Sequence, residues 1–279
     1  MLKEGADRIG HNFAFWKPRA GSVGPHVCLV AHVDTVYPCT KEVPAVSIVN
    51  KMTVLSRKTG LGADDRAGVY AALTLRERTG CSVLLTDKEE TGGIGAWEAS
   101  ATLRDYFKEN VNFFIEMDRR GNNDMVFYNN EPRKFVNFIG NFGFKKAPGS
   151  YSDISTLGKR TEVAGVNIST GYYREHTLNE ILVVDLLEYN IDRVQRIIEA
   201  KNNKKYKIGP VPWNYWSNRT NRFGTDNTHN LRTFSGKKEK EKEKEDDTGY
   251  YYGKYEDPYD VNDCYYDRES RAMIHHGMY

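Results

Sequence analysis

The sequence predicts an α/β protein, with a three-layer sandwich around a mostly parallel, mixed sheet. Short, continuously apolar runs such as 26–31 (HVCLVA) and 82–86 (SVLLT) are typical of strands that are buried on both faces. Segments with a helical spacing of apolar residues lie between such runs. Strands that alternate with helices favour a mostly parallel sheet with helices on its faces.

The elements can be justified in chain order from the first buried strand, 26–31. Residues 46–49 and 52–55 predict a hairpin with its turn at Asn50 and Lys51. After a glycine turn at 60–62, a helix over 65–78 has acid at its start and arginine at its end, which complements the helix dipole. The remaining elements are a strand over 82–86, a helix over 95–107, strands over 111–117, 125–128 and 162–169, and a closing helix over 183–200.

Composition divides the chain of 279 residues near position 200. The whole is polar, with 39% hydrophobic residues and a mean hydropathy of −0.66, but the apolar runs are concentrated before that point. Residues 237–247 (KKEKEKEKEDD) are of low complexity, and 249–279 are rich in Tyr, Asp and Gly. We therefore predict a folded domain over 1–200, which holds the candidate site described below, and a largely disordered appendage over 201–279.

Charge and cysteine usage exclude several classes of protein. A net charge of +2 indicates neither a nucleic-acid-binding nor a membrane-binding surface. The sequence lacks an apolar signal core and any run of roughly 20 apolar residues. Cys28 and Cys81 lie inside apolar runs, which favours buried free thiols and a cytoplasmic location. The oligomeric state stays open.

Acidic and histidine residues gather in five patches, mostly at the ends of predicted strands. These patches are His-Val-Asp at 32–34, Ala-Asp-Asp at 63–65, Glu-Glu at 89–90, Asp118, and Glu-His at 175–176. An open α/β sheet binds its ligands in the crevice beyond the carboxyl ends of its strands. Imidazoles and carboxylates are the ligands that suit zinc and neighbouring metals. The pattern therefore predicts a metal site, most simply that of a two-metal hydrolase.

Each patch offers a chemical role and a simpler alternative. His32 and Asp34 share a strand face, so the carboxylate could orient the imidazole, although a surface histidine with a turn-forming aspartate has the same spacing. Asp64 could bridge two cations, whereas Asp65 beside it could cap the helix. Glu116 has the strand parity of Asp118 and is therefore a rival ligand.

The adjacent Glu89 and Glu90 repel each other unless positive charge compensates them. Exposure to solvent is the simple explanation. The functional explanation divides the work, so that one glutamate binds metal and the other transfers a proton.

Five motifs together resemble those of the co-catalytic zinc exopeptidases, a group that includes peptidase T, carboxypeptidase G and bacterial leucine aminopeptidases. They are AHVDTV, GLGADDRAGVYAAL, TDKEETGG, EMDRRG and GYYREHT, and the resemblance covers about residues 26–185. The resemblance implies two zinc ions, with cobalt or manganese as substitutes. It also implies a cis peptide bond between Asp64 and Asp65. The implied ligands are His32, Asp64 and Asp118 for one ion and Asp64, Glu90 and His176 for the other, with Glu89 as the proton-transferring base and Asp34 orienting His32.

The segments between the motifs are short compared with these relatives. Only 57 residues, 119–175, separate Asp118 from His176, and only 29, 35–63, separate Asp34 from Asp64. Because these gaps are too short for an inserted lid or dimerisation domain, the chain resembles a minimal aminopeptidase. The expected substrate is a short peptide, or an N-acyl amino acid if the chain is a deacylase.

Two alternatives to an aminopeptidase stay open on the sequence. A carboxypeptidase or acyl-amino-acid deacylase would need a cation for the substrate carboxylate, and Arg119, Arg120 or Arg174 could supply it. A non-catalytic binding protein could instead act through its Tyr-rich tail. His275 and His276 in this tail could bind metal, although a pair of surface histidines is the simpler explanation. The complete ligand set favours the enzyme.

Overall fold

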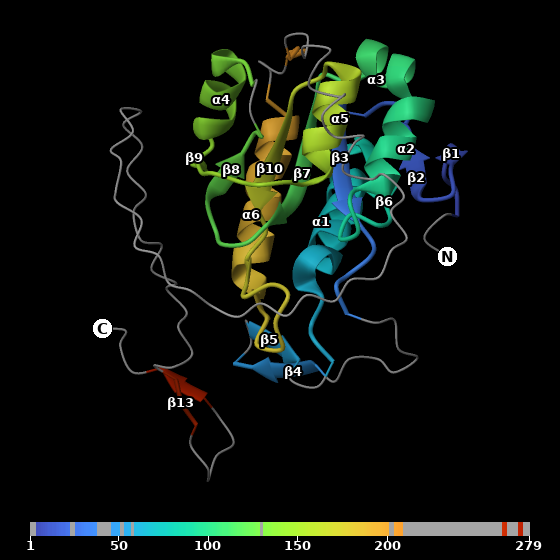
Figure 1. The fold of residues 1–279 in the computed structure, drawn as a ribbon. Coiled ribbons are helices and arrows are strands. Elements are labelled where there is room, and N and C mark those ends of the chain that lie inside the picture. The colour runs from blue at the N-terminus through green and yellow to red at the C-terminus, as the bar shows by residue number, and fades with distance from the viewer. Residues whose placement is uncertain are drawn as a thin grey trace, which may run out of the picture. The chain divides into compact units, whose positions relative to one another are not determined.

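A mixed eight-stranded sheet forms the centre of the fold, in this computed structural model (Figure 1). In spatial order its strands are β1 (Arg8–Ile9), β2 (Phe13–Trp16), β6 (Ser82–Thr86), β3 (Val27–His32), β7 (Phe113–Arg119), β10 (Gly165–Ser169), β8 (Asp124–Val126) and β9 (Lys145–Lys146). The four central strands, β6, β3, β7 and β10, run parallel to one another. β2 and β8 join them antiparallel, so the mixed, mostly parallel sheet is confirmed.

The structure describes most of the first 208 residues and two short strands further on. The described residues are 4–22, 26–37, 46–50, 53–56, 59–128, 131–200, 204–208, 264–266 and 273–275. Contacts between residues divide the chain into two compact units, Met1–Val211 and Pro212–Tyr279. In the second unit, β13 (Cys264–Tyr266) and β14 (Met273–His275) pair antiparallel. No helix among the described residues has the length and apolar character needed to span a bilayer.

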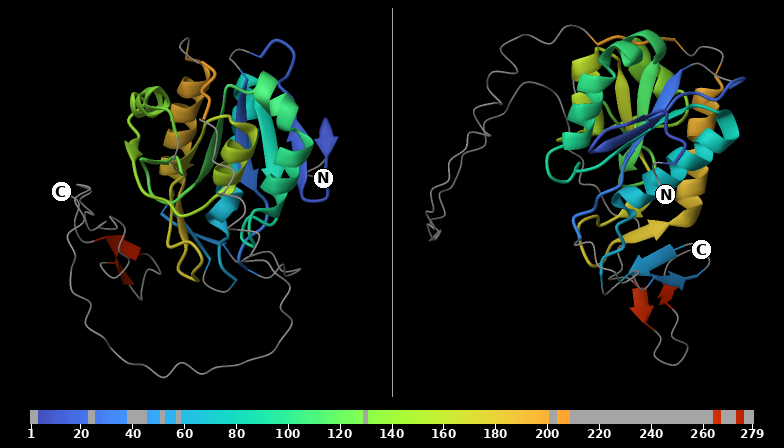
Figure 2. Two further views of the ribbon diagram at one scale, coloured as in Figure 1. Left: turned by 45° about the horizontal axis from the view of Figure 1, so that its top comes forward. Right: turned by 90° about the vertical axis from the view of Figure 1, so that its right-hand side faces the viewer.

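Helices cover both faces of the sheet, which produces the three layers (Figure 2). Residues of α1 (Ala63–Thr79), α4 (Arg133–Gly140) and α6 (Val184–Ile198) pack in the cluster on one face. Those of α2 (Ile94–Thr102), α3 (Arg104–Asn110) and α5 (Asp153–Thr161) pack in the cluster on the other. Side chains of a strand alternate between faces, so Leu29 of β3 belongs to the first cluster and Val30 to the second. This two-sided burial explains the continuously apolar strands.

A small antiparallel sheet lies at the end of the large one, with strand order β11 (Tyr172–Tyr173), β12 (Ile181–Val183), β5 (Thr53–Ser56) and β4 (Val46–Val49). The predicted hairpin is confirmed, since Val49 pairs with Thr53 across the turn. β12 pairs with β5, which brings segments more than a hundred residues apart in sequence into register. This pairing places the chain before α1 next to the chain before α6.

The predicted single helix over 95–107 is wrong, because α2 ends at Thr102 and α3 begins at Arg104. Leu103 between them has φ −114° and ψ 14°, outside the helical range. The break turns the chain so that the ring of Phe107 packs edge-on against Phe15 and Phe114, each at 5.3 Å between centroids.

Residues 204–208, which follow α6, belong to the same unit as the large sheet and pack against it. The backbone N–H of Tyr206 donates to Asn112, and that of Ala164 donates to Tyr206. The Tyr206 ring lies 4.8 Å from Phe135 and 5.8 Å from Phe138, between centroids. The reading of 201–279 as a disordered appendage stays a prediction, and the side chains of His275 and His276 lie outside the described residues.

Candidate metal centre

The predicted ligands gather beyond the carboxyl ends of the parallel strands, on the side of the small sheet. His32 ends β3, and Asp118 is the next-to-last residue of β7. Glu90 lies in the turn between β6 and α2, and Asp64 at the start of α1. His176 lies in the loop between β11 and β12. Parallel strands end at one edge, so the topology brings together residues that are far apart in sequence.

His32, Asp64 and Asp118 form the first group of potential ligand atoms. The His32 Nε2 atom lies 3.1 Å from Asp64 Oδ1 and 3.5 Å from Asp118 Oδ1. The imidazole is buried, with 1% of its side chain exposed. This group is therefore enclosed by the protein.

Asp64, Glu90 and His176 form the second group. The His176 Nε2 atom lies 3.1 Å from Asp64 Oδ2 and 3.1 Å from Glu90 Oε1. Half of the His176 side chain is exposed, so this group opens to solvent. Asp64 faces the first group with one oxygen and the second with the other. Such an arrangement can be shared between two cations.

The carboxyl groups of the two groups lie so close together that added positive charge would stabilise their ionised forms. Burial and the negative charge of Asp64 raise the pKa of Asp118 to about 7. Against the effect of burial, hydrogen bonds from His176 and His32 hold the pKa of Asp64 below its usual range. Hydrogen bonding to Asp64 raises the pKa of His176 to about 9. Three carboxylates and two imidazoles packed this closely fit divalent cations of the zinc type.

Glu89 belongs to neither group, although it is adjacent to Glu90. Its carboxyl lines the same pocket as Asp64 and Asp118. Burial and the charge of Asp118 raise the pKa of Glu89 to about 8. A carboxyl beside the ligands, with a raised pKa, is suited to accept and return a proton near neutral pH.

Asp34 lies beside His32, but the hydrogen bonds of its carboxylate to backbone N–H groups go to the loop that carries Glu89 and Glu90. The His32 Nδ1 atom is 3.0 Å from the carbonyl oxygen of Asp34 and 3.4 Å from its carboxylate. The two carboxylate oxygens accept the backbone N–H groups of Glu89 and Glu90 at 3.1 and 3.2 Å. Asp34 therefore contacts both the first imidazole and the glutamate turn.

The carboxylate of Asp65 accepts hydrogen bonds from backbone N–H groups, as expected for a residue that caps the helix. Its carboxylate is fully buried and accepts the N–H groups of His32 at 3.2 Å and Gly68 at 3.0 Å. The peptide bond between Asp64 and Asp65 is cis, as the resemblance implied. A Cβ at position 68 would lie 2.2 Å from the Asp65 carboxylate, which explains a glycine there.

Three residues that hold the ligands escape detection in the sequence. Asn167 accepts the backbone N–H of Asp118 at 3.0 Å and donates back to its carbonyl oxygen at 3.1 Å. The hydroxyl of Tyr172 donates to Asp118 Oδ1 at 3.1 Å. Glu180 accepts two N–H groups at the start of α1. For Asn167, the sequence offers one indication of such a role, namely a polar residue within the otherwise apolar run of β10.

Glu116, the rival of Asp118, is in neither group. It lies two residues further from the end of β7 and is fully buried. The Ser152 hydroxyl donates to its carboxyl. Asp118 and Glu116 point to the same face of β7, but only Asp118 is close enough to the end of the strand to join a ligand group.

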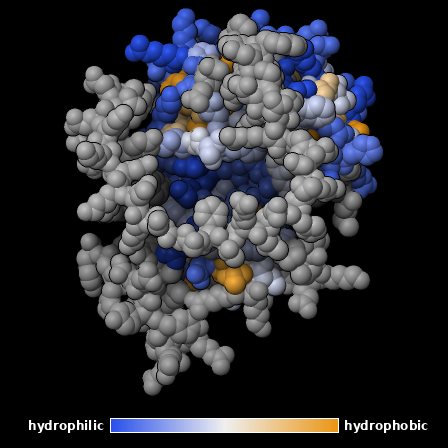
Figure 3. All heavy atoms as spheres, in the orientation of Figure 1, coloured by the Kyte–Doolittle hydropathy of each residue, from blue (hydrophilic) through white to orange (hydrophobic). Residues whose placement is uncertain are grey.

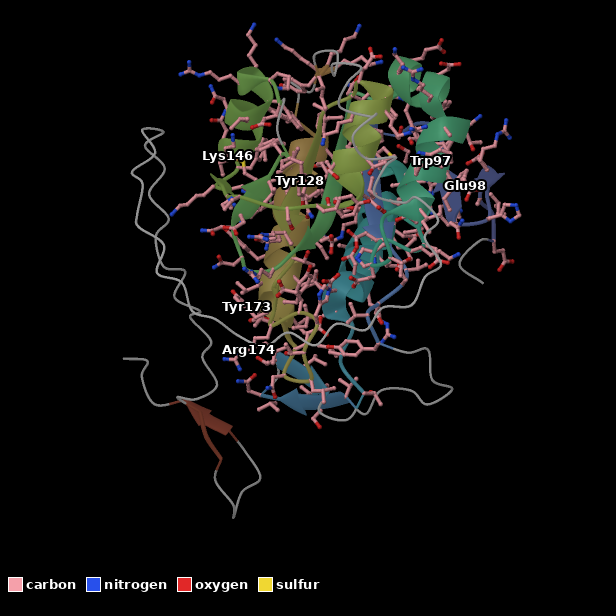
Figure 4. All side chains as sticks on the ribbon, viewed as in Figure 1. Trp97, Glu98, Tyr128, Lys146, Tyr173 and Arg174 are labelled. Atoms are coloured by element: carbon pink, nitrogen blue, oxygen red, sulfur yellow. The ribbon has the colours of Figure 1, made fainter. Side chains whose placement is uncertain are left out.

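The ligands open into a polar pocket of about 180 Å³. The lining includes the four ligand residues other than His32, together with Tyr128, Tyr151, Arg119, Arg120 and Glu175. Figure 3 shows hydrophilic side chains gathered in a hollow between the large sheet and the small one. Tyr173 belongs to β11 of the small sheet and Arg174 follows it, whereas Trp97 and Glu98 lie on α2, away from this sheet (Figure 4).

Comparison with solved structures identifies the same catalytic-domain fold in several peptidases. A tripeptidase from Staphylococcus aureus has 15% sequence identity over 67% of this chain and 83% of its own, with a TM-score of 0.52. The TET1 peptidase of Pyrococcus horikoshii has 13% identity over 71% and 90%, with a TM-score of 0.52. The aminopeptidase PepT of Bacillus cereus has 16% identity over 67% and 83%, with a TM-score of 0.51.

No protein-family profile matches the chain, and no curated protein matches it by sequence. At these identities the structural likeness establishes the fold alone, which this chain shares with these peptidases.

Proposed function

We propose that this protein is a metal-dependent aminopeptidase that removes N-terminal residues from short peptides. The single observation that carries the proposal is Asp64, whose two oxygens face two separate ligand groups with His32 and His176 at 3.1 Å. The full set would be His32, Asp64, Asp118, Glu90 and His176, holding two divalent cations, in the first place zinc. Two such cations would supply Lewis acidity for the substrate carbonyl and for the attacking water.

Residues of the chain would complete the chemistry. We assign Glu89 as the group that accepts the proton of the attacking water and returns it to the departing amine, because its carboxyl lines the pocket without belonging to a ligand group. Asp34 would keep the turn with Glu89 and Glu90 in place through its two backbone hydrogen bonds. Free, buried thiols at Cys28 and Cys81 fit the expected reducing, cytoplasmic environment.

The arginines that line the pocket favour an aminopeptidase over a carboxypeptidase or deacylase. Arg120 donates to Glu175 at 2.8 Å, and Arg119 lies 3.5 Å from Asp124. Both guanidinium groups thus face carboxylates of the protein. A substrate carboxylate would have to compete with them, whereas a free amine would meet a pocket rich in acids.

The test compares leucyl amide with acetyl-leucine at equal concentration, with zinc, cobalt and manganese in turn. We expect the amide to be hydrolysed and the acetylated compound to be left intact, because acetylation removes the positive charge of the amine. Faster turnover of acetyl-leucine would favour the deacylase alternative and leave the metal site standing. Loss of all turnover after chelation, with return on adding metal, is the control for a metal-dependent reaction.

A further inference from the structure

Glu180 links the two chain segments that carry Asp64 and His176. Its side chain is fully buried, four residues after His176 and directly before β12. The Glu180 Oε2 atom accepts the N–H of Gly62 at 2.7 Å, and Oε1 accepts the N–H of Asp64 at 3.0 Å. The carboxylate of Glu180, which belongs to the segment that carries His176, thus binds the loop that leads into α1 and carries Asp64.

The backbone N–H groups at the start of α1 need a hydrogen-bond acceptor. The first N–H groups of a helix lack partners within the helix, and here Asp64 and Asp65 have non-helical backbone angles. Gly62 has φ 62°, a left-handed conformation that glycine adopts without strain. The carboxylate of Glu180 therefore fixes a loop whose own geometry is irregular.

The other end of the contact is held by local turns. The N–H of Glu180 donates to the carbonyl of Thr177 at 3.1 Å, and the Thr177 hydroxyl donates to that of Arg174 at 2.8 Å. β12 then pairs with β5 directly after Glu180, with Ile181 opposite Leu55. Movement of Glu180 relative to His176 is restricted on both sides.

We propose that Glu180 is a positioning residue, which sets the distance between Asp64 and His176 and so the affinity for the cation that both would bind. This inference rests on the proposed metal site. Glu180 belongs to neither ligand group, so it would act through the backbone of Asp64. Partners of this kind typically change metal affinity 10- to 100-fold when replaced.

A cap that only stabilises α1 is the competing explanation, and it predicts a different result. Such a cap would lower the melting temperature but leave the metal affinity of the folded protein unchanged. The measurement must therefore be cobalt binding, followed by calorimetry and by the visible absorption of Co²⁺, with the melting temperature of each metal-free variant recorded alongside.

The test variant is Glu180→Gln, which keeps the shape but has one acceptor oxygen, so one of the two N–H groups loses its acceptor. We expect one of two cobalt ions to bind roughly 10- to 100-fold more weakly, with an altered absorption band. Glu180→Asp keeps the charge with a shorter reach, and we expect a smaller loss. Val194→Ala, a fully buried position on α6, is the control for lowered stability without a ligand contact.

Two results would overturn the inference. Wild-type cobalt affinity and absorption in Glu180→Gln and Glu180→Asp, with only the melting temperature lowered, would assign Glu180 to helix stability alone. Should Glu180→Gln fail to fold, Glu180→Asp decides by the same criterion. A wild-type chain that binds no cobalt would remove the proposed metal site itself, and this inference with it.

Discussion

Replacing Glu89 by glutamine should stabilise the metal-free protein while removing most of its activity. In the folded protein, burial and the charge of Asp118 raise the pKa of Glu89 from 4.5 to about 8. A difference of that size corresponds to about 5 kcal/mol at and above pH 8. Partial exposure to water screens some of this, so we expect a gain of about 2–4 kcal/mol, or roughly 5–15 °C in Tm for a domain of this size.

The sign of the pH dependence follows from which state binds the proton. Above pH 4.5 the unfolded chain releases the Glu89 proton, whereas the folded chain keeps it until about pH 8. Rising pH therefore favours the unfolded wild type, and glutamine removes that effect. The Tm difference between variant and wild type should be small at pH 4 and should grow up to pH 8.

Thermal unfolding after chelation, between pH 4 and pH 8.5, measures the stability effect. Glu77→Gln is the matched control, because the Glu77 side chain on α1 is 74% exposed and should give little change. With metal restored, Glu89→Gln should keep its cations and lose ~10²–10⁴-fold in turnover. A lowered Tm, a difference that does not depend on pH, or retained turnover would refute the assignment.

Further expectations concern the neighbouring ligand and the chain beyond α6. Glu90→Gln should bind one cation fewer than Glu89→Gln by elemental analysis, because Glu90 and not Glu89 belongs to the ligand group of His176, which it contacts at 3.1 Å; a lower metal content in Glu89→Gln would reverse the roles, and equal content would contradict the distinction. Tyr206→Ala should lower Tm by an amount equivalent to roughly 2–4 kcal/mol, because its ring packs against Phe135. Truncation after residue 235 should leave Tm and hydrolysis nearly unchanged, and a large drop would contradict the predicted appendage.

The sequence could predict those features that depend on local pattern. β3 and β6 were recognisable because burial on both faces makes a strand continuously apolar, and β6 has the predicted bounds 82–86. That His32 and Asp118 lie close together follows from topology once the strands are known, because parallel strands end together. The division of the ligands into two groups was implied by the resemblance.

Features that depend on a distant partner were not predictable. β2 and α5 were missed because Phe13–Trp16 is a short run and Asp153–Thr161 mixes polar residues with a glycine. Glu180 looked like any acid in a turn, since its partners lie 116 and 118 residues away in sequence. The break at Leu103 depends on how Phe107 packs against β7, which helical spacing alone does not specify.

The pairing of β12 with β5 has a consequence for how the protein is made. The chain leaves the ribosome with His32 first and His176 and Glu180 among the last residues of the site. Contacts between such distant segments form only after a long loop has closed. Because β12 (Ile181–Val183) pairs with β5 and follows the loop that carries His176, we expect the group that contains His176 to form after the group of His32, Asp64 and Asp118. Any cation that the second group binds would then be bound only after the whole unit Met1–Val211 has been synthesised.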